Sequence, residues 1–86
     1  APQPEDVQKL RFVVHDRQLK VENPTAWSMS LRLQIANKLK VDDVLVAPFG
    51  SVTLPIAQPV QVGESVIYEV FDDNGNPVGY QSHTGT

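Results

Sequence analysis

The stretch that decides the fold is Trp27-Ser28-Met29-Ser30-Leu31-Arg32-Leu33-Gln34-Ile35, in which every odd position is apolar and every even position is polar. Successive side chains of a β-strand point to opposite faces of the sheet, so this alternation predicts a half-buried strand. An amphipathic helix would need apolar residues three and four apart, which the stretch does not supply selectively. We therefore expect a strand over residues 27–35 with its odd face, Trp27 included, on the core.

A proline corner precedes this strand at Asn23-Pro24-Thr25. Asn-x-Thr has the form of a glycosylation acceptor, but the middle residue of an acceptor must not be proline. Proline cannot donate a ladder hydrogen bond, and it biases Asn23 away from helical backbone. The tripeptide is therefore predicted to end one strand and to turn the chain into the next.

The rest of the chain shows the same period of two between turn signals. The clearest turn is Asp72-Asp73-Asn74-Gly75-Asn76-Pro77, because Asn-Gly tolerates a positive φ at little cost. Gly63 marks the tight point of the preceding loop. About seven short strands and no segment of helical period predict an all-β fold, an antiparallel sandwich or a small barrel, with the sandwich preferred at this length. The other strands are expected over residues 9–14, 19–22, 41–46, 51–56, 65–71 and 78–82.

Composition excludes several classes of function. The chain has 86 residues, which allow one domain with a modest core. The net charge of -3 and the scattered basic residues give no case for binding nucleic acid or an anionic membrane surface. With no cysteine there is no disulfide, zinc-thiolate site or cysteine nucleophile. No apolar stretch approaches the roughly 18 residues of a membrane span, so we expect no membrane insertion.

The residues that could perform catalysis do not form a recognisable motif. His15 is expected in a turn and His83 in a frayed tail, and no G-x-S-x-G elbow is present. The neighbouring acids Asp42 and Asp43 should point to opposite faces of a strand and so should not share a reaction centre. The dispersed glycines form no phosphate-binding loop. We predict that the chain is not an enzyme and has no cofactor.

The hairpin turn begins like a calcium loop and then departs from it. Asp72-x-Asn74-x-Asn76 matches the first ligand positions, but Pro77 stands where glycine is required and His83 where a bidentate glutamate is required. We predict a hydrated turn and no metal site.

The N-terminal segment Ala1-Pro2-Gln3-Pro4 favours extended, semi-rigid backbone. Residues 1–7 are accordingly predicted to be an interdomain linker or simply the start of the chain. Residues 8–82 are predicted to form the sandwich, and residues 83–86 a frayed C-terminal tail.

Three stretches in order resemble the second, C-terminal domain of periplasmic pilus-assembly chaperones of the chaperone–usher pathway. They are LKVENPTAW (residues 19–27), VLVAPFGSVTL (residues 44–54) and VIYEVFDDNGN (residues 66–76). The chain departs from the family pattern at Ala26-Trp27, where Pro and an aromatic are common, and at Asn74, where an aromatic is usual. The residues matching the family motifs, to which we assign structural roles, are Asn23, Pro24, Thr25, Trp27, Pro48, Tyr68 and Gly75.

The resemblance implies an immunoglobulin-like sandwich in the periplasm, whose parent protein binds, stabilises and delivers fimbrial subunits to the outer-membrane usher. In the family, donor-strand complementation uses a strand of the N-terminal domain, which lies outside these residues. The implied partners are that N-terminal domain, the pilus subunits and the usher. Asp73 aligns with an aspartate of the salt bridges that orient the two domains; alternatively, it is an exposed turn carboxylate.

Two other functions are compatible with a small β-sandwich. A structural or adhesive Ig-like module of a surface or pilus protein would occur in tandem copies or with a self-complementing terminal strand. A carbohydrate-binding module would expose aromatic side chains on one sheet face.

Overall fold

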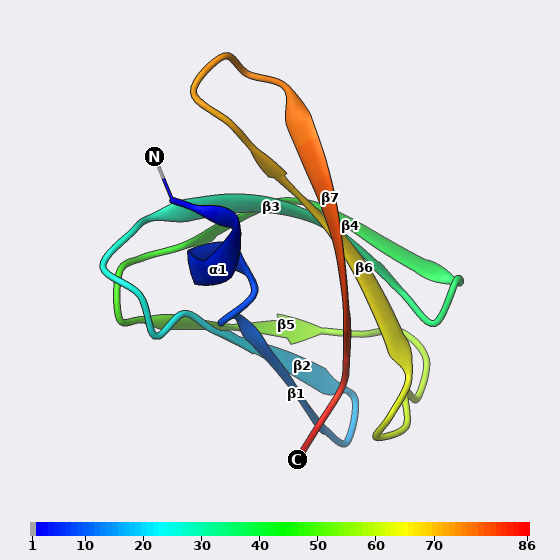
Figure 1. Ribbon diagram of the computed structural model, residues 1–86. Helices are drawn as coiled ribbons and strands as arrows, with labels where there is room; N and C mark the ends of the chain where they lie inside the picture. Colours follow the sequence, from blue (N-terminus) through cyan, green and yellow to red (C-terminus); the bar gives the residue numbers. More distant parts are fainter. Residues whose placement is uncertain (1) are drawn as a thin grey trace.

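Two antiparallel sheets pack face to face in the computed structural model, which describes residues 2–86 (Figure 1). One sheet has the strand order β1-β2-β5 and the other the order β4-β3-β6-β7. This arrangement confirms the all-β sandwich. The elements are α1 (Pro4–Val7), β1 (Arg11–His15), β2 (Gln18–Glu22), β3 (Met29–Ile35), β4 (Leu39–Val46), β5 (Ser51–Pro55), β6 (Ser65–Phe71) and β7 (Pro77–His83).

Strand β3 has the alternation that the sequence predicts, from Met29 onward. Its four apolar side chains are buried, and Ser30 and Arg32 between them are exposed. The expectation that Trp27 also belongs to this buried face is wrong, because its side chain is 42% exposed. The backbone bends through residues 25–27 and becomes extended only at Met29, so the phase of the strand does not reach back to Trp27.

The core lies between the two sheets and centres on Tyr68 of β6. Its ring lies 5.0 Å from that of Phe12 on β1 and 5.5 Å from that of Tyr80 on β7. Full burial of each aliphatic side chain contributes about 1.5–3 kcal/mol. The buried apolar residues are Val7, Leu10, Phe12, Leu19, Val21, Met29, Leu31, Leu33, Ile35, Val44, Val46, Ile56, Val60, Val66, Tyr68 and Val70.

Strand β4 contains a shift in its pairing with β3 that its sequence does not predict. Leu31 of β3 pairs with Val44 and Leu33 pairs with Val41, so Asp42 and Asp43 together face one residue of β3. Asp43 has a φ of 58°, in the left-handed region. This is a β-bulge, in which one extra residue bends the strand and increases its twist.

Residues 4–7 of the N-terminal segment form the helix α1, whereas the sequence predicts extended backbone there. Residue 1 of the predicted linker lies outside the described residues. Proline fits the first turn of a helix, because its fixed φ suits that turn and its missing N–H would have no partner there. The carboxylate of Asp6 accepts a hydrogen bond from the backbone N–H of Gln3 at 3.0 Å. Val7 at the end of α1 is only 2% exposed. Helix α1 is therefore held to the sandwich through Val7.

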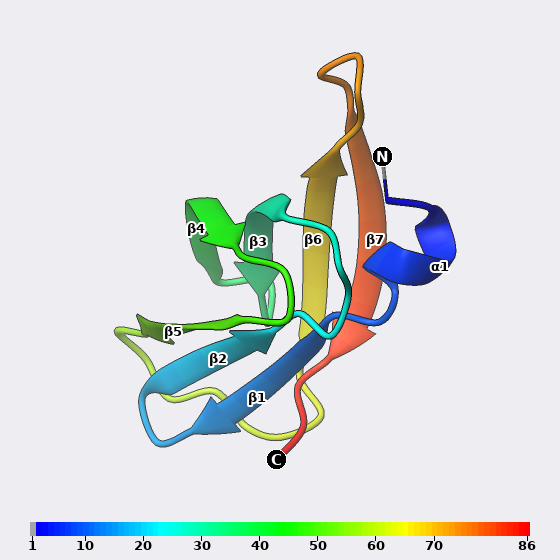
Figure 2. The same ribbon diagram turned by 90° about the vertical axis from the view of Figure 1, so that its left-hand side faces the viewer.

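The C-terminal tail is paired, and the expectation that it frays is wrong. His83 is the last residue of β7, and Thr84 is buried. Gly85 then crosses to the other sheet, where its carbonyl accepts from Val14 N–H at 3.0 Å and its N–H donates to the Phe12 carbonyl at 2.8 Å. The tail thereby links the two sheets along the edge of β1 (Figure 2).

Candidate functional site

The corner between β2 and β3 is held by the buried side chain of Asn23, which is 2% exposed. Its Nδ2 donates to the Trp27 carbonyl at 2.6 Å and to the Ala47 carbonyl at 3.1 Å. Its Oδ1 accepts from the N–H of Thr25 at 3.0 Å and from the Thr25 hydroxyl at 2.6 Å. One amide side chain thus uses both donors and its acceptor to fix the corner.

The same network joins the corner to the loop between β4 and β5. Asn23 N–H donates to the Gly50 carbonyl at 2.9 Å, and Phe49 N–H donates to the Thr25 carbonyl at 2.9 Å. Pro48 lies in the turn of that loop, where a fixed φ favours the reversal. The chain therefore crosses from one sheet to the other in a set geometry.

Two aromatic side chains stand exposed on these joined loops. Trp27 is 42% exposed and Phe49 is 74% exposed. Phe49 also has a φ of 55°, which is costly for a residue with a Cβ. The sequence does not predict the exposed position of Phe49, because none of the neighbouring residues indicates a left-handed backbone at this position. A shallow pocket beside Phe49 is lined by Arg11, Glu22 and Pro24 as well.

The turn between β6 and β7 carries Asp73. Its neighbour Asp72 closes the turn, because the Asp72 carboxylate accepts from the N–H of Asn74 at 2.9 Å and of Asn76 at 2.8 Å. Gly75 takes a φ of 80°, the positive value that the Asn-Gly pair predicts. The turn projects beyond the sandwich (Figure 1). Asp73 is exposed on it, and the Asp72 carboxylate serves the turn's own backbone.

Tyr68 of β6 is the anchor between the core and the N-terminal segment. Its side chain is 1% exposed, and its hydroxyl donates to the Val7 carbonyl at 3.1 Å. Burial, with a smaller contribution from Tyr80, raises the pKa of the Tyr68 hydroxyl to about 12. The phenol is therefore neutral at physiological pH and acts as a hydrogen-bond donor.

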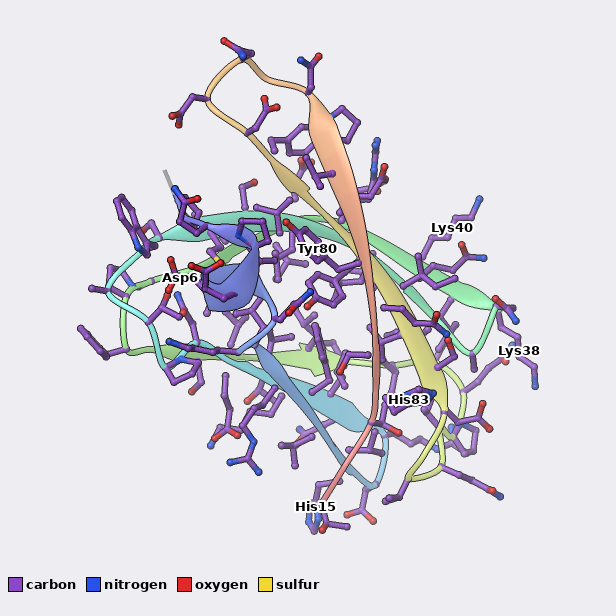
Figure 3. All side chains as sticks on the ribbon, viewed as in Figure 1. Asp6, His15, Lys38, Lys40, Tyr80 and His83 are labelled. Carbon is purple, nitrogen blue, oxygen red and sulfur yellow. The ribbon has the colours of Figure 1, made fainter. Side chains whose placement is uncertain are left out.

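The two histidines are not brought into a catalytic arrangement. His15 lies at the end of β1 and is strongly exposed, with its Nε2 3.5 Å from the Asp16 carboxylate. His83 lies on β7, and Figure 3 shows Asp6 well away from both histidines. Within residues 2–86, no three His, Cys, Asp or Glu side chains are gathered where they could hold a metal ion. In the same residues, no helix has the length and apolar character needed to cross a membrane.

The outer face of the larger sheet carries one well-formed ion pair. Arg32 Nε lies 2.8 Å from the Glu69 carboxylate, and its guanidinium lies 5.5 Å from the centre of the Phe71 ring. All of these side chains are partly exposed, so the ion pair contributes at most about 1 kcal/mol.

Comparison with known protein families matches residues 5–82 to one family, described as the C-terminal domain of the pili assembly chaperone PapD. The match takes in both sheets and every strand described above except the last residue of β7. No curated protein matches the chain.

Proposed function

Because the chain belongs to the family of pili assembly chaperone C-terminal domains, we propose that it is the second domain of a two-domain periplasmic chaperone. That chaperone binds fimbrial subunits, stabilises them and delivers them to the outer-membrane usher. The family match over residues 5–82 is the observation that carries the proposal.

The mechanism is donor-strand complementation. A strand of the N-terminal domain supplies the strand that a fimbrial subunit lacks, which is strand addition to a sheet edge. The domain described above forms the second wall of the cleft in which the subunit sits. This function needs a fixed surface and no catalytic group, cofactor or ATP. The Asn23 corner supports a fixed surface, since it locks the loops on one side of the domain.

The position of Asp73 supports a role in orienting the two domains. The start of the described chain lies beside the β6–β7 hairpin, whose turn carries Asp73 (Figures 1 and 2). Pro2 and Pro4 border a small apolar pocket with Val78 and with Asp72, the residue before Asp73. A domain preceding these residues would thus enter next to the turn. We propose that Asp73 then takes part in an interdomain salt bridge.

The test is co-purification of the parent protein with a fimbrial subunit. The parent is expressed in the periplasm with a tagged subunit, and we expect it to hold the subunit in a one-to-one complex. The 86-residue chain expressed alone should not retain the subunit, because the donor strand is missing. Loss of usher-dependent subunit release on deletion of residues 1–86 from the parent would support the delivery step. Tandem copies of this domain in the parent, without bound subunit, would instead indicate the structural or adhesive module.

A further inference from the structure

The two sheets have four edge strands, which are β1 and β5 in one sheet and β4 and β7 in the other. An edge strand presents unpaired backbone N–H and C=O groups that can template pairing with another chain. Proteins protect such edges with short strands, proline, charged side chains, bulges or a covering segment. Which edge lacks protection indicates where another strand can add.

Three of the four edges are protected. Gly85 of the C-terminal tail pairs with β1 and covers part of that edge. Strand β5 has only 5 residues and ends at Pro55. Strand β4 contains the bulge at Asp42 and Asp43 and also carries Lys40.

The edge of β7 has few of these devices: its first residue is Pro77, and the N-terminal segment borders it only where Pro2 and Pro4 lie near Val78 and Tyr80. Its 7 residues, PVGYQSH, include no Asp, Glu, Lys or Arg. It pairs with β6 without a register shift from one end to the other. Long, regular and uncharged edges of this kind are the ones that accept an added strand.

The register shows which backbone groups of β7 point outward. Asp72 N–H donates to the Asn76 carbonyl at one end of the hairpin, and Thr84 N–H donates to the Glu64 carbonyl at the other. Hydrogen-bonded and non-hydrogen-bonded pairs alternate in an antiparallel ladder. Positions 78, 80 and 82 therefore bond to β6, and the N–H groups of Gly79, Gln81 and His83 point away from it. Among residues 2–86, no backbone carbonyl accepts a hydrogen bond from these three outward N–H groups.

Gly79, in the middle of this edge, has no explanation within the domain. Its φ lies outside the left-handed region, and a Cβ placed there would meet nothing within 4 Å. Glycine weakens a strand interior, and it often marks a site where another backbone approaches closely. No side chain of the described domain fills the space at the Gly79 Cβ position, so this part of the edge is open to another backbone.

Exposed apolar side chains lie on both faces of the β6–β7 hairpin. Val78 is 40% exposed and, with Tyr80, lines the small pocket on the inner side. On the outer side, Ile67 and Phe71 of β6 are 40% and 41% exposed. An added strand with apolar side chains would find its nearest apolar contact at Val78, because Ile67 and Phe71 lie one strand further from it.

The charge around the edge selects the partner. All seven basic residues of the chain lie in residues 1–40, and residues 41–86 contain no Lys or Arg. Carboxylates stand near both ends of β7, at Asp72 in the hairpin turn and at Glu64 before β6. A second copy pairing antiparallel along this edge would bring the acidic hairpin turn of one copy against the Glu64 end of the other, whereas a strand flanked by basic residues would be attracted.

We propose that the outer edge of β7 receives an extended strand of another protein, with apolar side chains in its centre and Lys or Arg at its ends. This edge is separate from the donor strand of the proposed function, which belongs to the N-terminal domain. The inference therefore goes beyond that function, and it can be tested on the 86-residue chain alone.

The probe is a nine-residue peptide of alternating Val and Thr with Lys at both ends, added to the ¹⁵N-labelled chain. We expect binding to slow amide hydrogen exchange at Gly79, Gln81 and His83, because the peptide pairs with those N–H groups. The same peptide with Glu at its ends should bind at least about five-fold more weakly at low ionic strength, a difference that shrinks at high salt. A peptide with a central proline should not bind, because it lacks a ladder donor.

Two variants give the controls. Gly79→Pro removes an outward N–H without removing a bond to β6, and it should abolish protection while the circular dichroism spectrum is retained. Val78→Lys should weaken binding of the Lys-ended peptide, whereas Thr53→Lys on the edge strand β5 should leave it unchanged. If Gly79→Pro unfolds the chain, the proposal is tested by the other two variants: it requires Val78→Lys to weaken peptide binding and Thr53→Lys to leave it unchanged.

Three results would overturn the proposal. They are protection at β4 or β5 with none at β7, equal binding of the Lys-ended and Glu-ended peptides, and protection of the β7 amides by self-association without any peptide. None of these outcomes bears on whether the parent protein holds a fimbrial subunit.

Discussion

Replacing Asn23 by alanine should remove much of the stability of this domain. The side chain is buried, and the change deletes the donors to the Trp27 and Ala47 carbonyls and the acceptor for Thr25. Each net hydrogen bond is worth about 1 kcal/mol, and a buried group left without a partner costs about 1–3 kcal/mol. We therefore expect the free energy of unfolding to fall by about 3–4 kcal/mol.

That loss is large for a domain of this size, whose total stability is expected to be roughly 4–13 kcal/mol. Urea unfolding followed by far-ultraviolet circular dichroism measures it. With an m-value of about 1 kcal/mol per molar urea, the midpoint should fall by about 3 M. The melting temperature should fall by at least about 12 °C. Asn74→Ala in the exposed hairpin turn is the matched control, and it should change stability by less than about 0.5 kcal/mol.

Asn23→Asp separates hydrogen bonding from packing, because the two side chains have nearly the same shape. The aspartate keeps an acceptor for Thr25 but places a second carboxylate oxygen against the Trp27 and Ala47 carbonyls. Burial and those carbonyl dipoles would raise the pKa of the new carboxyl above its unfolded value. The variant should therefore gain stability as the pH falls, because the protonated form can donate again. The reasoning is refuted if Asn23→Ala costs less than about 1 kcal/mol, or if Asn23→Asp shows no such recovery.

Three further predictions rest on single side chains. The pKa of Tyr68 is raised from 10.0 to about 12 in the folded state, so its contribution to the free energy of unfolding is complete below pH 10 and is lost as the pH rises through 12. Urea unfolding at pH 9 and at pH 11.5 should show this loss of stability. Tyr68→Phe should make the difference between the two pH values smaller, and it should cost about 1 kcal/mol of stability at pH 7. Thr84→Val should cost about 1–2 kcal/mol, since the Thr84 hydroxyl donates to the Gln61 carbonyl at 2.7 Å; an unchanged melting temperature would show that the tail is not held as described. Phe49→Asn should stabilise the domain by about 0.5–1 kcal/mol, because asparagine accepts the left-handed backbone more readily; a lower melting temperature would contradict this.

Local patterns predicted the strands and turns because those elements depend on neighbouring residues. Alternation located β3, and Asn-Gly located the hairpin turn, in which Gly75 takes a positive φ. Gly63 likewise has a φ of 93° at the expected tight point of its loop. In each case the backbone needs only what its own side chains or their absence provide.

The structure departs from the predictions, or adds to them, where distant segments decide the local structure. Asn23 is readable as a turn residue, but its bond to the Ala47 carbonyl depends on a loop 24 residues away. Extending the strand period back through the bend wrongly predicts that Trp27 lies in the core. Gly85 pairs with β1 from the far end of the chain, which a fraying rule for termini cannot anticipate. Helix α1 has only 4 residues, too few to show a helical period.

In the candidate site, too, features set by neighbouring residues could be predicted, and features set by distant segments could not. The family motifs that mark Asn23, Pro48 and Gly75 are short and local, so they could be read directly. The exposed Phe49 could not be predicted from the sequence, because its position depends on a left-handed backbone angle. The open edge of β7 could not be predicted either, because it depends on which strands remain unpaired in the assembled sheets. Exposure of an edge is a property of the assembled sheets and is absent from any single strand.

The most direct test of the central claim is to compare retention of a tagged fimbrial subunit by the parent protein and by the 86-residue chain. Both are expressed in the periplasm at matched levels, and the subunit bound per mole is measured after affinity purification. The proposed function predicts a one-to-one complex with the parent and no retained subunit with the isolated chain. Equal retention by the two, or none by the folded parent, would contradict it.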